Sequence, residues 1–291
     1  MRLSTDLEAR MRGVVAQVLK PVRTKSPVMV TCAPELGLAN FLYLWLHADA
    51  ARRRGEDIFV QHQPEMDRWL AVFPEIRELV RPKNEFGIRN KRRLGTFFRY
   101  GDEFTPEQLD VFVRERMLTA PLFSDVDKRL DARADDEIAI HVRRGTYYTV
   151  PQWRAKYTMD IAMYVRLAVE REIAADGAAR RITVYSNDPQ WCESRLAFLT
   201  EMTQKLCVTT PENGDDGDFR DLATYRRLVL SNSTYSYWAG YVAGVLRGRN
   251  GVRVTAPWFH LREMDGRYVS AEPFAAPQWS IIQDIPGGWD A

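Results

Sequence analysis

The 291-residue chain has only three cysteines and four histidines. Cys32, Cys192 and Cys207 lie far apart and form no C-x-x-C pair, which excludes a disulfide framework and a cysteine-ligated zinc site. With so few histidines and no H-E-x-x-H motif, we expect no bound metal. Scattered single cysteines are typical of a protein kept in a reducing compartment.

The chain also lacks a strong net charge and a long apolar run. Its 41 basic and 39 acidic residues give a net charge of +2, which provides no general attraction to nucleic acid. No stretch approaches the roughly 18 apolar residues of a spanning helix, and residues 1–25 lack the apolar core of a secretory signal. We therefore expect a cytoplasmic protein without an integral membrane segment. Peripheral contact with a membrane is compatible with this sequence.

Apolar residues make up 45% of the chain, which excludes disorder of the whole. Hydrophobic patterns predict a helix at 5–20, short helices near 64–80 and 106–118, and a basic loop at 83–95. Further helices are expected at 39–54, 158–175, from 189, from 218 and at 234–247, and strands at 28–33, 58–60, 137–142, 181–186, 205–208, 228–231 and, last, 252–255. This alternation predicts an α/β fold with a parallel sheet covered on both faces.

The predicted strand at 137–142 ends in His141, Val142, Arg143, Arg144 and Gly145. Ligands of open α/β sheets bind beyond the carboxyl ends of the strands. Neighbouring side chains of a strand point to opposite faces, so His141 and Arg143 should share one face and Arg144 the other. The planar guanidinium group suits a phosphate, although salt bridges to carboxylates explain two arginines equally well.

Two further predicted strands end in small polar residues that lead into a helix. Asn187 and Asp188 precede Pro189, and the sequence Ser-Asn-Ser-Thr-Tyr-Ser occupies 231–236. Such residues either cap the helix or offer donors to a diphosphate. Three polar strand ends in one half of the chain would meet at one edge of a sheet, and this arrangement favours a ligand site there.

These segments resemble the conserved blocks of the α-1,2-fucosyltransferases. Residues 141–148 resemble the H-x-R-R-G-D-Y motif, 184–191 the V-F-S-D-D-P-x-W block, and 218–238 the block that ends in N-S-S-F-S-W-W. Residues 37–40 resemble the opening G-L-G-N, and 256–259 with 278–279 resemble the closing blocks. The order and spacing agree over residues 30–282, whereas 60–130 matches nothing in the family.

The resemblance implies a GT-B-like fold with two facing Rossmann-like domains and parallel sheets. It places an acceptor-side domain at 1–130 and a donor-binding domain at 131–291. It implies GDP-fucose as the donor substrate, a glycan as the acceptor, inversion of the anomeric carbon, and no required cofactor or metal. Arg143 and Arg144 would be the catalytic pair, with Arg143 on the leaving diphosphate.

The resemblance also assigns binding roles. His141 would contact the guanine, and Asp188 could accept hydrogen bonds from the guanine ring NH and amino group. The donor-binding set is His141, Arg143, Asn187, Asp188, Asn232, Ser233, Thr234 and Ser236. The acceptor or cleft side comprises Gly37, Asn40, Thr146 and Tyr147.

The sequence departs from the family pattern where Thr146 replaces the aspartate of R-R-G-D. A threonine hydroxyl cannot act as a general base near neutral pH. The base is therefore not identified by the motif, and Glu35 and Asp102 are candidates only as carboxylates. The same departure leaves open the alternative that the chain binds a nucleotide sugar and has no transferase activity.

Two other function classes remain open. Asp216-Gly217-Asp218 and Asp125-Val126-Asp127 read as D-x-D, a pattern that can hold a divalent ion against a diphosphate in a metal-dependent transferase. A nucleic-acid binder would use the basic and aromatic residues of 89–100, but the near-neutral charge of the chain argues against one. Those residues are Arg89, Lys91, Arg92, Arg93, Phe97, Phe98, Arg99 and Tyr100.

Overall fold

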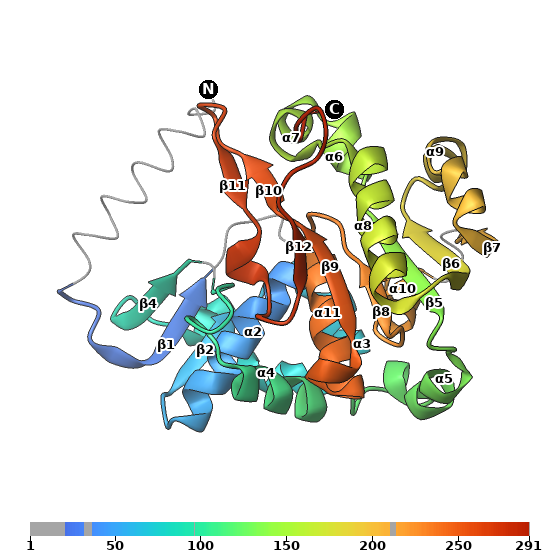
Figure 1. Ribbon diagram of the computed structural model, residues 1–291. Helices are drawn as coiled ribbons and strands as arrows, with labels where there is room; N and C mark the ends of the chain where they lie inside the picture. The colour runs from blue at the N-terminus through green and yellow to red at the C-terminus, as the bar shows by residue number, and fades with distance from the viewer. Residues whose placement is uncertain (1–20, 32–36, 96, 210–213, 291) are drawn as a thin grey trace. The chain divides into compact units, whose positions relative to one another are not determined.

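A computed structural model describes residues 21–31, 37–95, 97–209 and 214–290. The helix predicted at 5–20, the end of the strand predicted at 28–33, and Glu35 lie outside these residues. The chain divides into two compact units, residues 1–97 and 98–291. Each unit has its own parallel sheet (Figure 1).

The first unit is built on a β-α-β motif, as predicted. Strand β1 (Lys25–Thr31) leads to helix α2 (Leu38–Arg53) and to β2 (Ile58–Gln61), which pairs parallel with β1. Helix α2 is apolar on most of its surface and buries Phe41, Trp45 and their neighbours. The short elements η1 (Pro64–Met66), α3 (Asp67–Val72), η2 (Pro74–Leu79) and β3 (Val80–Arg81) follow, and the sheet order is β3-β2-β1-β4.

The prediction of a loop at 83–95 is wrong. After η3 (Lys83–Glu85), residues Asn90–Leu94 form strand β4, which pairs parallel with β1. The backbone N–H of Lys25 donates to the carbonyl of Arg89 at 3.0 Å and begins this pairing. A run of basic residues conceals the strand pattern, because an end strand needs no buried face and tolerates charge.

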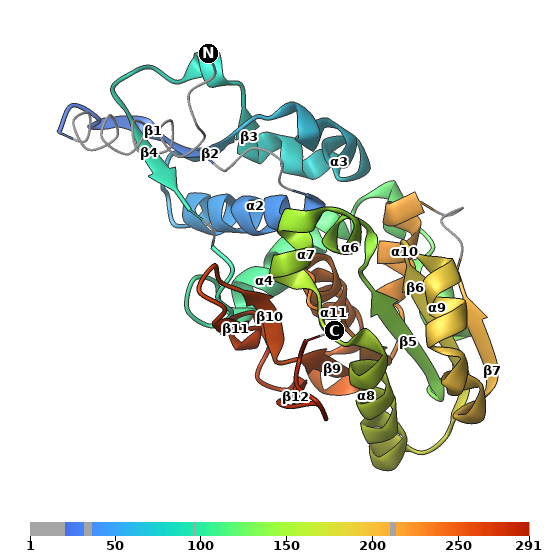
Figure 2. The same ribbon diagram turned by 90° about the horizontal axis from the view of Figure 1, so that it is seen from above.

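The second unit contains a six-stranded, all-parallel sheet of order β12-β9-β8-β5-β6-β7. Its central strands are β5 (Glu137–Val142), β6 (Ala179–Ser186), β7 (Thr203–Val208) and β8 (Arg227–Val229). Helices α8 (Ile161–Asp176) and α9 (Pro189–Arg195) lie on one face, and α10 (Gly214–Leu222) and α11 (Thr234–Arg247) on the other (Figure 2). Helix α10 begins four residues before the predicted start near 218. Between α9 and β7 lies η6 (Ala197–Glu201).

Strand β9 (Arg253–Pro257) is not the last strand, contrary to prediction. The 3-10 turn η8 (Arg249–Gly251) precedes it, and an antiparallel hairpin of β10 (Phe259–Arg262) and β11 (Tyr268–Ser270) follows. After η9 (Glu272–Phe274), β12 (Ser280–Ile282) pairs parallel with β9. These strands were not predicted because each has only three or four residues, which is too few to reveal the hydrophobic alternation of a strand.

The unit boundary lies at residue 97 instead of near 130. Helix α4 (Pro106–Phe112), the π-helical turn η4 (Val113–Met117), η5 (Pro121–Phe123) and α5 (Val126–Ala132) belong to the second unit. Arg114 donates to the carbonyl of Val245 at 2.9 Å, and Arg249 donates to that of Pro106 at 2.7 Å. These arginines tie the segment to the ends of α11 and η8, so it folds with the later sequence.

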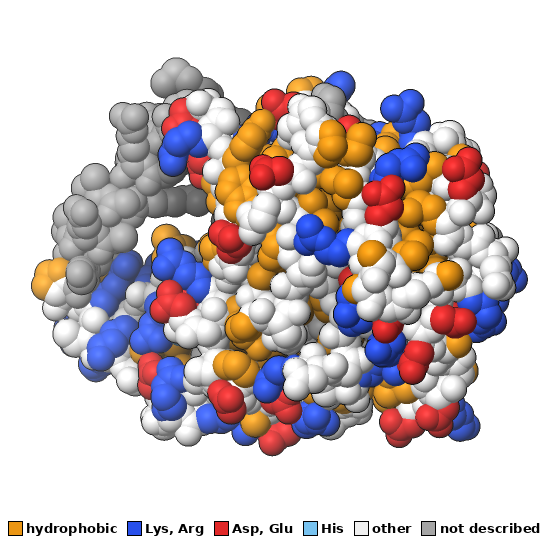
Figure 3. Space-filling view, viewed as in Figure 1, with side chains coloured by type: hydrophobic (Ala, Val, Ile, Leu, Met, Phe, Trp, Pro, Cys, Tyr) orange, Lys and Arg blue, Asp and Glu red, His pale blue; other side chains and the backbone are white. Residues whose placement is uncertain are grey.

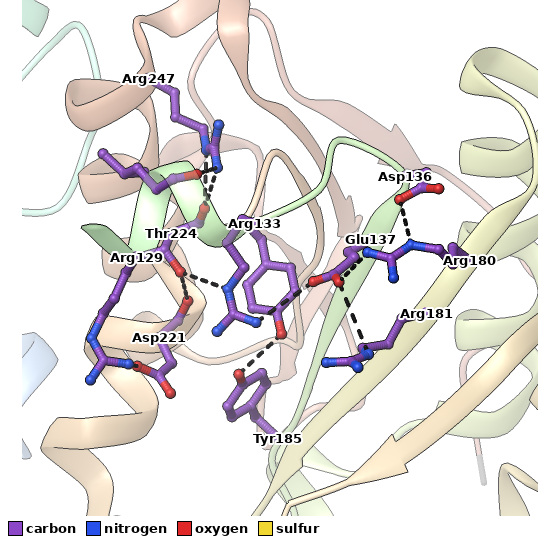
Figure 4. A network of polar contacts seen from close by, with 12 residues as sticks. Arg129, Arg133, Asp136, Glu137, Arg180, Arg181, Tyr185, Asp221, Thr224 and Arg247 are labelled. Carbon is purple, nitrogen blue, oxygen red and sulfur yellow. Dashed lines mark hydrogen bonds and ion pairs between the residues drawn. The ribbon is translucent and has the colours of Figure 1, made fainter. Parts of the chain in front are cut away.

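A charged network holds the amino ends of the strands in the second unit (Figure 4). Glu137, only 4% exposed, lies 2.9 Å from Arg180, 3.6 Å from Arg133 and 4.0 Å from Arg181. Removing one partner of such a buried group leaves an uncompensated charge, which typically costs about 3–5 kcal/mol. The network is structural, and the carboxyl ends of the same strands remain for a ligand.

The fold class expected from the sequence, an α/β protein of the GT-B-like kind with two Rossmann-like parallel sheets, is confirmed. None of the helices in the described ranges is long and apolar enough to span a bilayer. Basic and acidic side chains are interspersed over much of the face drawn in Figure 3. This distribution agrees with the near-neutral charge of the chain.

Candidate nucleotide-sugar site

The end of β5 places its three polar side chains as the strand period predicts. Ile138, Ile140 and Val142 pack in the core cluster shared with α8 and α9. His141 instead contacts Ser236 of α11, while Arg144 lies over Trp191 of α9. His141 therefore faces α11 and Arg144 faces α9, as predicted, although Arg144 stands two residues beyond the end of β5.

His141 is a buried, neutral histidine. Its Nδ1 is within hydrogen-bonding distance of the hydroxyls of Ser231, at 2.9 Å, and Ser236. Burial, and then the nearby Arg143 guanidinium, lower the pKa of His141 to about 3. A neutral imidazole beside a guanidinium avoids repulsion between two cations and keeps the positive charge of the site on the arginine.

Arg143 is half-buried and lacks a carboxylate partner among the described residues. Its guanidinium lies over the Tyr147 ring, 5.4 Å from the centroid, and Tyr147 in turn stacks on Tyr157 at 4.3 Å. A partly desolvated cation held by an aromatic ring and left without a counter-ion is suited to bind an anion. The site thus presents a positive charge at the end of the central strand.

Arg144 has the opposite environment. Its Nε donates to the Asp188 carboxylate at 2.8 Å, and its guanidinium lies between the rings of Tyr148 and Trp191, at 4.0 and 4.1 Å. The other oxygen of Asp188 accepts from the Trp191 backbone N–H at 3.3 Å and caps α9. The charge of this arginine is paired with a carboxylate inside the protein, so Arg144 holds the loop in place.

The bend after Arg144 depends on a glycine. Gly145 has a φ of +35°, and a Cβ at this position would lie 2.2 Å from Nδ2 of Asn187. The Oδ1 of Asn187 accepts from the Arg144 backbone N–H at 2.9 Å. Asn187, predicted to bind the donor, braces the loop that carries both arginines and leads into α6 (Gly145–Thr149) and α7 (Pro151–Tyr157).

The serine-rich loop between β8 and α11 lies beside the same strand end. Ser236 is fully buried against His141, and Ser233 is near enough to Tyr147 to lower the pKa of its phenol. The Asn232 amide donates to the carbonyls of Tyr157, at 2.9 Å, and His260, at 3.0 Å. Asn232 therefore fixes the loop.

Ser233 and Thr234 stand at the amino end of the 14-residue helix α11, where backbone N–H groups attract anions. With Ser236, His141 and Arg143, they are the members of the predicted donor-binding set that the structure brings to one place. Asn187, Asp188 and Asn232 lie nearby as the supports of their loops.

Asp218 is a candidate that the sequence reasoning did not include in the site. Its carboxyl is half-buried on α10, and Oδ1 is buried without a hydrogen-bond partner among the described residues. Burial, followed by the charges of Asp221, Asp215 and Asp216, raises its pKa to about 6. Its charge also acts on Tyr235, whose ring lies 5.1 Å from that of His141. The one sequence feature that pointed to Asp218 was its position at the start of the family-like block at 218–238.

Of the remaining candidates, Thr146 and Asp102 belong to the second unit, and Gly37 and Asn40 belong to the first. Thr146 is exposed at the start of α6, and Gly37 and Asn40 stand at the start of α2 in the first unit. Asp102 is exposed and lies 3.4 Å from Arg99, and Glu35 is outside the described residues. Neither carboxylate is supported as a base.

The two D-x-D sequences stand at or on helices of the second unit, and the structure describes all of their residues. No group of three or more potential ligands gathers in the described part of the chain. Asp125 precedes α5 and pairs with Arg129 at 2.8 Å. Asp216 and Asp218 stand two positions apart on α10, so their side chains point in different directions from the helix.

Comparisons with known proteins give a consistent result. The model of glycosyl transferase family 11 matches residues 91–279. Human galactoside alpha-(1,2)-fucosyltransferase 1 is 29% identical over 111 residues, 37% of this chain and 29% of the human protein. The same enzyme of Saimiri sciureus is 29% identical over 120 residues, 40% of this chain and 31% of that protein. The chain therefore aligns with less than a third of the length of these relatives.

Among solved structures, E. coli ADP-heptose lps heptosyltransferase II is similar with a TM-score of 0.47 and 10% identity. That match covers 90% of this chain and 92% of the other. A mutant of Arabidopsis thaliana FUT1 in complex with GDP is similar with a TM-score of 0.44 and 12% identity, over 84% of this chain and 79% of the other.

Proposed function

The chain belongs to glycosyl transferase family 11, and on this premise we propose that it transfers fucose from GDP-fucose to a hydroxyl group of a glycan. We further propose an α-1,2 linkage, inversion at the anomeric carbon and no metal requirement. The blocks at the three strand ends support the donor, and the similarity to galactoside alpha-(1,2)-fucosyltransferase 1 supports the linkage.

The observation that carries the proposal is the contrast between Arg143 and Arg144. Arg144 is neutralised by Asp188 at 2.8 Å, whereas Arg143 lacks a carboxylate partner in the described ranges. Negative charge grows on the departing diphosphate during transfer, and a fixed cation there stabilises the transition state more than the ground state. Loss of one such donor typically raises the barrier by roughly 2.7–4 kcal/mol.

We assign guanine recognition to Asp218 instead of Asp188. Both oxygens of Asp188 are engaged, by Arg144 and by the amino end of α9. Asp218 has a buried oxygen without a hydrogen-bond partner among the described residues, and its charge acts on Tyr235, whose ring lies 5.1 Å from that of His141. A carboxylate there can accept from the ring NH and amino group of guanine, which a uracil does not offer.

Asp218→Asn tests this assignment, with Asp188→Asn as the matched control. Inosine diphosphate lacks the exocyclic amino group of GDP, so the wild type should bind GDP more tightly. Asp218→Asn should lose that preference, whereas Asp188→Asn should keep it and lose stability instead. An unchanged preference in Asp218→Asn would remove Asp218 from base recognition.

The acceptor hydroxyl must lose its proton as it attacks the sugar. Thr146 stands where related sequences carry aspartate, and the two carboxylates described beside the cluster, Asp188 and Asp218, are assigned to Arg144 and to guanine. We therefore propose that orientation of the acceptor and stabilisation of the diphosphate supply most of the rate.

The direct test is a transfer assay with GDP-fucose, GDP-mannose and UDP-galactose against a panel of galactose-ended acceptors. We expect fucose transfer that survives EDTA, with the linkage and anomeric configuration read by NMR. Arg143→Ala should lose on the order of 100-fold or more in kcat, while Arg195→Ala, an exposed arginine on α9, should keep it. Binding of GDP-fucose without transfer to any acceptor would favour an inactive relative.

A further inference from the structure

The first unit presents an end strand whose charge is not balanced. Strand β4 lies at one end of its sheet, beside β1. The two adjoining segments, 21–31 and 86–95, contain no Asp or Glu. Their basic residues are Arg23, Lys25, Arg89, Lys91, Arg92 and Arg93, and Figure 3 shows Lys and Arg side chains gathered over β1 and β4.

Of these six, Arg93 is the one that the described structure pairs, with Glu56 at 3.2 Å and His47 at 3.1 Å. The other five make no ion pair with a described carboxylate. Arg23 and Arg92 are close enough to repel, because burial and then the Arg23 guanidinium lower the pKa of Arg92. The Nε of Arg23 is buried without a hydrogen-bond partner. The guanidinium groups of Arg23 and Arg92 thus lie near each other, and neither forms an ion pair with a carboxylate in the part of the chain that the structure describes.

Apolar side chains are exposed on the same two segments. Val22, Ile88 and Leu94 are 46%, 63% and 76% exposed, and they are three of the five large apolar side chains exposed in the described residues. The hydrogen bond from Lys25 N to Arg89 O holds 22–25 beside 88–89. We call the set of Val22, Arg23, Lys25, Ile88, Arg89, Lys91, Arg92 and Leu94 the β4 surface.

We propose that the β4 surface docks the protein on a membrane that contains anionic phospholipids. The unpaired cations attract the headgroups, and the apolar side chains enter the interface between headgroups and acyl chains. Long Lys and Arg stems can lie along the apolar contact while their charges stay at the headgroups. A single-stranded nucleic acid would also need aromatic rings for stacking, and the β4 surface contains none.

The experiment measures binding of the full chain to vesicles of phosphatidylcholine, alone or mixed with phosphatidylglycerol, by co-sedimentation at physiological ionic strength. We expect binding to the mixed vesicles and little to the neutral ones. Equal binding to both, or none to either, would overturn the proposal. The vesicle assay does not measure glycosyl transfer, so its result is independent of the proposed transferase activity.

The first variant combines Arg89→Gln, Lys91→Gln and Arg92→Gln, all at exposed positions. It should lower the vesicle partition coefficient on the order of 100-fold, since each cation at an anionic surface contributes about 1 kcal/mol and every 1.4 kcal/mol is tenfold. The matched control combines Lys128→Gln, Arg195→Gln and Lys205→Gln, which remove the same charge from exposed positions of the second unit. The control should bind as the wild type does.

A second variant, Ile88→Ser with Leu94→Ser, separates a membrane from other polyanions. It leaves the charge unchanged and should still lower the partition coefficient at least tenfold, because the exposed apolar area is lost. Equal vesicle binding by this variant and the wild type would contradict insertion. Binding of single-stranded DNA as tight as that of mixed vesicles would identify a polyanion site instead.

Discussion

Gly145→Ala tests whether the bend after the two arginines is held as the structure shows. An L-residue with φ near +35° costs about 1–2 kcal/mol. The new Cβ would also stand 2.2 Å from Nδ2 of Asn187, so that side chain must swing away. Its hydrogen bond to the Arg144 backbone N–H is then lost, at about 0.5–1.5 kcal/mol. The expected loss of unfolding free energy is about 2–3 kcal/mol.

The assay is urea unfolding of the wild type, Gly145→Ala, Asn187→Ala and the double variant. Each single variant loses the hydrogen bond between Asn187 and the Arg144 backbone N–H, so the sum of the two losses counts this bond twice. The double variant should therefore be more stable than that sum predicts, by about 1 kcal/mol. Gly55→Ala is the control, since Gly55 has a φ of +86° and nothing within 4 Å of its Cβ position. Equal losses at both glycines, with additive effects at 145 and 187, would refute the reasoning.

Three further predictions concern packing and titration. Gly240→Ala should lose about 1–3 kcal/mol of unfolding free energy, because its Cβ would meet the Trp279 ring at 2.9 Å, whereas Gly244→Ala should lose none. Asp218→Asn should raise the unfolding free energy by about 1 kcal/mol at neutral pH, after allowance for solvent screening. The unfolding free energy of the wild type should fall as pH rises toward 6, because the pKa of Asp218 is raised, and that of the variant should not. NMR titration should find the His141 ring neutral down to about pH 5, since its pKa is lowered to about 3; a midpoint near its ordinary value would contradict the burial described.

The strand ends could be predicted from the sequence because a period of two fixes which side chains share a face. The placement of His141 toward α11 and of Arg144 toward α9 follows from this rule. The roles of the aspartates could not be predicted in this way. Asp188 and Asp218 both lie in polar family-like blocks. Only the contacts show that Asp188 is engaged by Arg144, while Asp218 has an oxygen without a hydrogen-bond partner among the described residues.

The unit boundary and β4 escaped prediction for a different reason. Both depend on partners distant in sequence: Arg114 bonds to Val245, and Lys25 bonds to Arg89. The local charge and hydropathy of a segment do not indicate such pairings. The basic segment 89–93 therefore read as a loop, although it forms the end strand of a sheet.

The most direct test of the account is the change in unfolding temperature that GDP, GDP-fucose and UDP produce in the wild type and in Arg143→Ala, each with and without EDTA. A ligand at 100 times its Kd adds about 2.7 kcal/mol of stability. The account predicts stabilisation of the wild type by GDP and GDP-fucose, unaffected by EDTA, and its loss in Arg143→Ala. Stabilisation by UDP alone, or stabilisation that EDTA abolishes or Arg143→Ala retains, would contradict it.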